Sequence, residues 1–240
     1  MLTTSGEPTP FDSSRSSYFG IIDLAGFKKD RFYLYQSRWN PTVKFAHILP
    51  HWNWPDRVGQ VTPVHVFSSA DQAELFVNGV SQGVQKRGQY QYRFRWDRVT
   101  YEPGELRVTT WKNGALWAND TVRTTGEAAQ LSASAYKNRV SIKADGEDLS
   151  FISVAVKDEK GDVVPLAMNA ITFSIQGPGK ILVTDNGDPT DMVPFPSKER
   201  KAFNGYALAI VKANRGASGN ITVTATSRGL KAAEITLGVL

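Results

Sequence analysis

Two carboxylates and two histidines are the first side chains of this sequence to consider for chemistry. Glu7 and Asp12 lie near the N-terminus, and paired carboxylates can serve general acid–base catalysis. Glu7, however, precedes a proline in a loop-like stretch, which favours a structural or solvent-exposed role. His47 and His51 have a spacing that suits a metal site on a helix. Pro50 separates them, so the sequence favours packing, and we expect no metal ion.

Two tryptophans carry the one sugar-binding prediction. Trp52 and Trp54 stand two apart in an extended segment. Alternate side chains of an extended chain face the same side, so both rings could stack on a sugar. The alternative, burial at a boundary between domains, is favoured, and both residues remain carbohydrate-binding candidates.

Basic and aromatic residues alternate between positions 86 and 98, a composition that also occurs in single-strand nucleic-acid binders. The strict alternation over residues 90–96 predicts a half-buried strand with an aromatic face and a polar face. Because Arg93 and Arg95 then lie opposite the aromatic rings, we expect no nucleic-acid partner. The aromatic residues of this predicted strand are Tyr90, Tyr92, Phe94 and Trp96.

Composition sets broad limits on the class of protein. The 240 residues include 21% charged and 41% hydrophobic residues and carry a net charge of +5, which is ordinary for a folded domain. No apolar run approaches the roughly 20 residues of a membrane span, so no membrane partner is expected. The chain has no cysteine, which excludes disulfides and thiolate metal sites, and no cofactor is expected. Its compartment stays open, and the sequence is compatible with a soluble, a secreted or a periplasmic protein.

The hydrophobic pattern predicts one helix followed by strands. A helix is expected over residues 30–38, ended by Asn40-Pro41 because proline cannot continue it. Strands are expected from residue 60 onward, with a hairpin turn at Asn78-Gly79 and another hairpin joining residues 106–111 to 116–122. The acidic residues 185–191 could supply oxygen ligands to Ca²⁺, but their spacing is irregular, so a turn is predicted there.

A second series of strands follows a predicted linker at residues 126–130. Short strands separated by turn clusters are typical of an immunoglobulin-like sandwich. The expected strands cover residues 140–143, 150–156, 171–175, 181–184, 205–211, 221–226 and 233–237.

These motifs resemble a known family, the family 2 glycoside hydrolases of the β-galactosidase type. Three segments resemble the end of the catalytic barrel, two the sandwich domain that follows it, and three the C-terminal immunoglobulin-like domain. The barrel-end segments are residues 6–10, 16–27 and 30–37. The segments of the first sandwich are residues 47–54 and 73–81, and those of the C-terminal domain are residues 145–151, 185–189 and 200–205.

The resemblance implies an all-β fold: tandem immunoglobulin-like β-sandwich domains preceded by a short loop-plus-helix remnant of a (β/α)8 barrel. The implied domains are residues 1–40 for the barrel end, 41–126 for the first sandwich and 127–240 for the C-terminal sandwich. Family members use two glutamates on earlier barrel strands for retaining hydrolysis. Those glutamates have no counterpart here, so no residue is predicted to be catalytic, and whether the chain counts as an enzyme stays open.

The expected function is therefore that of a non-catalytic scaffold, inactive alone, in an enzyme that hydrolyses terminal β-galactosides. Its implied partners are the catalytic barrel domain, a β-galactoside or other oligosaccharide, and a second copy in a homo-oligomer. The alternative is a stand-alone carbohydrate-binding or structural β-sandwich module. Exposed apolar residues on the predicted helix would make the isolated chain depend on a partner.

Overall fold

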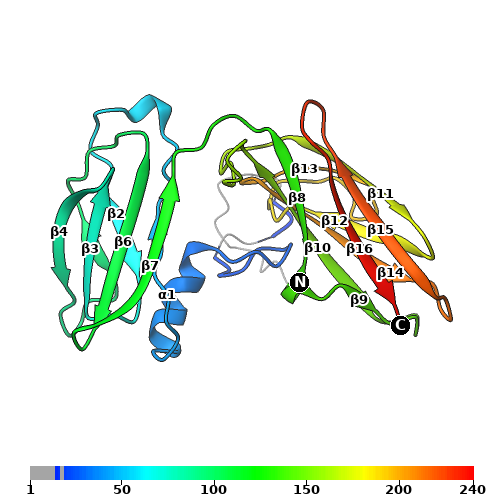
Figure 1. Cartoon of the computed structure of the whole chain (residues 1–240), viewed down its shortest axis with the longest axis horizontal. Coiled ribbons are helices and arrows are strands. Elements are labelled where there is room, and N and C mark those ends of the chain that lie inside the picture. The colour runs from blue at the N-terminus through cyan, green and yellow to red at the C-terminus, as the bar shows by residue number, and fades with distance from the viewer. Residues whose placement is uncertain (1–13, 17–18) are drawn as a thin grey trace. The chain divides into compact units, whose positions relative to one another are not determined.

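A computed structural model describes residues 14–16 and 19–240 of the chain. Glu7, Asp12 and the motif at residues 6–10 lie outside the described residues. The fold is all-β and divides into two compact units. We call residues 28–125 the central unit, and residues 126–240 together with the segment up to Phe27 the C-terminal unit. Figure 1 shows the strands of both.

Within residues 14–16 and 19–240 there is one α-helix, α1, which spans Asp30–Trp39 and is one residue longer than predicted. Asp30 in the first turn and Arg38 in the last complement the helix dipole. Asn40 donates its backbone N–H to Gln36 O at 3.0 Å before Pro41 ends the helix. Among the described residues, no helix is long and apolar enough to cross a membrane.

The central unit contains two antiparallel sheets, in the orders β1-β2-β5 and β4-β3-β6-β7. Alternation in β3 and β6 buries every second residue, and the inner faces of the two sheets share one hydrophobic core that includes Trp52, Leu75 and Phe94. A short 3-10 helix spans Pro55–Arg57. The strands are β1 (His47–Leu49), β2 (Val64–Phe67), β3 (Gln72–Val77), β4 (Val80–Lys86), β5 (Phe94–Trp96), β6 (Glu105–Lys112) and β7 (Ala115–Arg123).

Both hairpin predictions in the central unit are confirmed. Asn78 and Gly79 have φ values of 50° and 82°, as a type I′ turn requires at both central positions, and they join β3 to β4. Asn113 and Gly114 adopt the same left-handed conformation, with φ of 52° and 76°, and join β6 to β7.

The predicted seven-residue aromatic strand was wrong over its first half. β5 contains only Phe94–Trp96, while Tyr90 is 88% exposed. β2 pairs with β5 only from Val64 to Val66, so the residues before Phe94 have no partner strand. They form instead a turn in which Gln91 N donates to Gly88 O at 3.1 Å.

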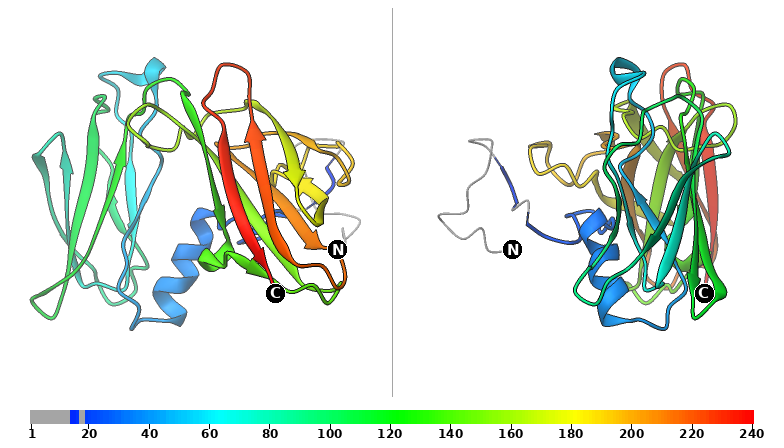
Figure 2. Two further views of the ribbon diagram at one scale, coloured as in Figure 1. Left: turned by 45° about the vertical axis from the view of Figure 1, so that its right-hand side comes forward. Right: turned by 90° about the vertical axis from the view of Figure 1, so that its left-hand side faces the viewer.

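The C-terminal unit is a sandwich of two sheets, in the orders β12-β14-β10-β8 and β13-β11-β15-β16-β9. Figure 2 shows β15 and β16, in orange and red, side by side within the second sheet. Apolar residues from both sheets fill two hydrophobic clusters. The strands are β8 (Gln130–Ala135), β9 (Ser141–Ile142), β10 (Leu149–Lys157), β11 (Ala170–Gln176), β12 (Gly179–Asp185), β13 (Glu199–Lys201), β14 (Tyr206–Ala213), β15 (Gly219–Thr226) and β16 (Ala233–Val239), and a second 3-10 helix spans Tyr136–Asn138.

The sequence pattern missed three strands, β1, β8 and β13. β1 and β13 are three residues long, too short for alternation to be visible. β8 consists mostly of alanine and serine, whose small side chains give little hydrophobic contrast between its faces. Each of these strands forms because a neighbouring strand supplies hydrogen bonds, as β10 does for β8.

Candidate functional site

The two histidines do not converge. His47 Nε2 lies 2.7 Å from Asp30 Oδ1, and its ring stacks on Tyr33 with centroids 3.8 Å apart. His51 stacks on Trp54 at 4.3 Å, and burial, only partly opposed by Asp30, lowers its pKa. In the part of the chain that the structure describes, no three His, Cys, Asp or Glu side chains gather as metal ligands do. The two histidines pack and hydrogen-bond locally instead.

Trp52 lies in the core of the central unit. Its side chain is 0% exposed, its Nε1 donates to Glu102 O at 2.9 Å, and its ring meets Tyr101 edge-on at 4.9 Å. A ring that stacks on a sugar needs an open face. Trp52 is therefore buried, but in the core of the central unit rather than at the domain boundary that the sequence favoured.

Trp54 is half-buried and more accessible than Trp52. Its Nε1 donates to His51 O at 2.7 Å, and the histidine ring occupies one of its faces. Sugar binding by Trp54 stays a prediction. It would have to use the part of the indole that His51 leaves open.

Arg15 fastens the segment before α1 to the C-terminal sandwich. Its Nη2 donates to Asp185 Oδ1 at 2.5 Å and to Asp188 O at 2.9 Å, and its Nε donates to Asp188 O at 3.0 Å. The side chains of Arg15 and Asp185 are 13% and 7% exposed. Because water is largely excluded, loss of either partner would leave the other charge buried without compensation, which costs more than the loss of an exposed pair.

Two further contacts follow along the same segment. The ring of Phe27 lies 5.3 Å from that of Tyr206, and burial raises the pKa of Tyr206. Asp23 lies so close to Gly187 that a Cβ there would clash with its carboxylate, and the φ of Gly187 is +79°. The resemblance to a barrel end thus falls on a segment that is bound to the C-terminal sandwich at several points.

Arg200 organises the long loop between β12 and β13. Its side chain is fully buried. It donates to Asp191 Oδ2, Val193 O, Thr184 O and Pro194 O at 2.7 to 3.1 Å. Sequence reasoning missed this role, because an arginine at the single inward position of a three-residue strand has no pattern to distinguish it from a surface arginine.

The acidic residues of that loop serve the turn predicted for them. Asp185 Oδ1 accepts from the backbone of Asn186 and Gly187, and Asp188 Oδ1 accepts from Thr190. These two carboxylate oxygens therefore accept hydrogen bonds within the loop itself. Beside it lies a cavity of about 500 Å³ whose lining includes the exposed Met168 and Met192.

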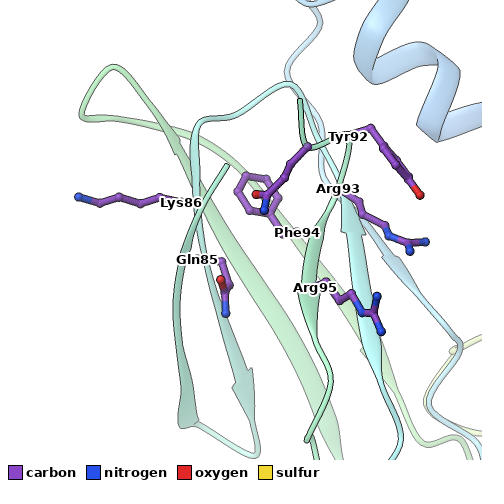
Figure 3. A pocket seen from close by; sticks show the side chains of 7 residues that line it. Gln85, Lys86, Tyr92, Arg93, Phe94 and Arg95 are labelled. Carbon is purple, nitrogen blue, oxygen red and sulfur yellow. The ribbon is translucent and has the colours of Figure 1, made fainter. Parts of the chain in front are cut away.

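A smaller hollow of about 240 Å³ lies between β4 and β5 in the central unit (Figure 3). Phe94 lies at its centre, with Gln85 on the β4 side. Lys86 points away on one side, and Arg93 and Arg95 point away on the other. The basic side chains around the hollow therefore do not converge on a ligand.

These observations define a class of protein, an all-β region of two sandwiches in which the segment before α1 is bound to the C-terminal sandwich. Comparison with known proteins agrees. Residues 133–236 match the description "Glycoside hydrolase family 2 C-terminal domain 5", and residues 59–118 match a domain of unknown function, DUF4982. The chain belongs to glycoside hydrolase family 2 and corresponds to the C-terminal region of its enzymes.

Individual relatives match over almost the whole chain. This chain is 44% identical to the beta-galactosidase BoGH2A of Bacteroides ovatus, over 95% of this chain and 26% of that protein. It is 33% identical to a putative beta-glucuronidase of Formosa agariphila, over 89% of this chain and 21% of that one. A beta-glycosidase structure from Bacteroides vulgatus superposes with a TM-score of 0.89 at 30% identity, over 95% of this chain and 29% of that one. The chain thus spans about a quarter of the length of the curated relatives it matches.

Proposed function

We propose that this chain is the non-catalytic scaffold region of a retaining β-galactosidase and that its partner is the catalytic barrel domain. The observation that carries the proposal is the Arg15 anchor. A segment whose sequence resembles the end of the barrel is bound through a nearly buried ion pair to the C-terminal sandwich. Such an anchor would hold the barrel end against the C-terminal unit while the chemistry takes place elsewhere.

The galactoside specificity rests on the 44% identity to a beta-galactosidase. The putative beta-glucuronidase at 33% identity makes β-glucuronides the second substrate class to test. We further propose the division into residues 1–40, 41–126 and 127–240 as the order of barrel end, first sandwich and C-terminal sandwich in the parent enzyme.

A chimeric enzyme tests this proposal. The chain would replace the matching C-terminal quarter of the Bacteroides ovatus relative, and hydrolysis of chromogenic β-galactosides and β-glucuronides would be measured. We expect the isolated chain to hydrolyse neither substrate and the chimera to hydrolyse the galactoside. Activity of the chain alone would contradict the proposal and return attention to Glu7 and Asp12.

Binding of neutral oligosaccharides separates the scaffold from a carbohydrate-binding module. The isolated chain would be titrated with galactose-containing oligosaccharides while Trp fluorescence is recorded. The scaffold predicts no saturable change. Saturable binding that is lost in Trp54→Ala would instead favour the binding module and confirm the prediction for Trp54.

A further inference from the structure

The three-stranded sheet of the central unit has an inner face in the core and an outer face. The register pairs His47 with Phe67, Leu49 with His65, and His65 with Arg95. In an antiparallel sheet, paired residues lie on the same face. Since the intervening residues belong to the core, these pairs form the outer face.

The helix α1 covers one part of this outer face. Tyr33 of α1 stacks on His47, and Asp30 of α1 lies 2.7 Å from His47 Nε2. Phe67, paired with His47, is buried. The end of the face that carries His47 and Phe67 is thus an interface between the sheet and a helix that resembles the last helix of the barrel.

The rest of the face carries Leu49, His65 and two arginines. We call His65, Arg93 and Arg95 the cationic row, after the charges of its two arginines. Arg93 Nη1 lies 3.3 Å from His65 Nδ1. Burial, and after it the charges of Arg93 and Arg95, lower the pKa of His65, so at neutral pH the imidazole can accept a hydrogen bond from Arg93. Arg95 forms an ion pair with Asp97. The row and Asp97 together therefore contain two guanidinium groups and one carboxylate.

The side of α1 that the sheet does not cover also carries exposed aromatic side chains. Tyr35 and Trp39 lie side by side, with ring centroids 4.7 Å apart, and are 39% and 74% exposed. A helix with aromatic residues on two sides is typical of a helix packed between two layers. The layer beyond α1 must therefore be apolar where it meets Tyr35 and Trp39.

We propose that the cationic row is a docking surface for carboxylate side chains of the catalytic barrel domain, next to the place where α1 already joins the sheet. This inference rests on the proposed function. The occupant follows from continuity, because the row extends the face that α1 covers, and from charge, because two guanidinium groups on one face require acidic partners once water is excluded.

The test uses the active chimera described above. Arg93→Glu/Arg95→Glu reverses the charge of the row. The control variant, Lys86→Glu/Arg228→Glu, changes the net charge equally at exposed positions, and Lys86 points away from Arg93 and Arg95. At low salt we expect the row variant to inactivate on heating about tenfold faster than the control variant. High salt should narrow that difference, because it screens charge.

The possible outcomes separate the two proposals. Equal inactivation rates for the row and control variants would overturn the docking inference and leave the scaffold proposal standing. An unmutated chimera without activity would overturn both. Unchanged circular dichroism of the isolated row variant shows that the chain itself still folds. Binding of polygalacturonate, a soluble polyanion, would be measured as well. If the unmutated chimera bound it and the row variant did not, the row would be open to solvent, and the docking inference would be overturned.

Discussion

Replacement of Arg200 by methionine probes the packing of the C-terminal unit most directly. Methionine preserves much of the length and apolar surface of the side chain but removes every donor and the charge. Asp191 then keeps a largely buried carboxylate, 11% exposed, without its guanidinium partner. The carbonyl groups of Thr184, Val193 and Pro194 each lose a hydrogen bond.

The expected cost follows from these contacts. Removal of one partner from a buried ion pair typically lowers the free energy of unfolding by about 3–5 kcal/mol, and unsatisfied acceptors act in the same direction. The total free energy of unfolding of a native protein is about 5–15 kcal/mol. We therefore expect Arg200→Met to remove at least about a fifth of the free energy of unfolding of the C-terminal unit.

The distribution of tryptophan allows the two units to be followed separately. All six tryptophans, from Trp39 to Trp117, lie in the central unit. In urea titrations, tryptophan fluorescence reports that unit, whereas far-UV circular dichroism reports both. Arg200→Met should shift a transition seen by circular dichroism to lower urea and shift the fluorescence transition much less.

The matched control is Arg139→Met in the same unit. Arg139 pairs with Asp148 at 2.7 Å, but its side chain is 49% exposed, so its loss should cost less than about 1 kcal/mol. If Arg200→Met cost no more than Arg139→Met, the claim that burial makes the Arg200 network important would be refuted.

The pH dependence of the Arg200 effect has a defined sign. Burial opposes ionisation of Asp191, but hydrogen bonds from Val193 N and Arg200, with the charges of Arg200 and Arg15, outweigh it and lower its pKa. A carboxyl with a lowered folded pKa stabilises the fold above its unfolded pKa of about 3.9, and this contribution is lost as the pH falls through the folded value. The stability difference between the wild type and Arg200→Met should be full at pH 7 and shrink below about pH 4.

Three further predictions concern individual contacts. Arg15→Met should free the segment before α1 and raise its rate of limited proteolysis by about tenfold or more, since the carboxylate of Asp185 would lose its partner; an unchanged rate would remove support for the anchor. Trp52→Ala should lower the free energy of unfolding of the central unit by about 3–5 kcal/mol in fluorescence-monitored urea titrations, and a cost below about 1 kcal/mol would contradict its place in the core. Tyr35→Ser/Trp39→Ser should reduce self-association of the isolated chain at high concentration in light scattering, whereas a wild-type chain that is already monomeric there would show that these rings need no cover.

The sequence by itself determined those local elements that a single residue or a short hydrophobic period is sufficient to specify. Asn78-Gly79 and Asn113-Gly114 specify their hairpins because few other residues adopt left-handed φ at low cost. Proline after Asn40 ends the helix for an equally local reason. The all-β class and the family membership were also present in the sequence, through period-two patterns and long motifs.

Tertiary structure alone decided which polar residues act together. Arg15 and Asp185 are far apart in the sequence and meet only because the segment before α1 runs along the C-terminal sandwich. The predicted strand at residues 90–96 shows the same dependence. Its alternation satisfied the pattern, but a strand forms only where a neighbour offers hydrogen bonds, and β2 ends too soon for Tyr90 and Tyr92. Local rules fix φ, ψ and period, whereas partner strands and buried ion pairs arise from contacts that no short window of sequence contains.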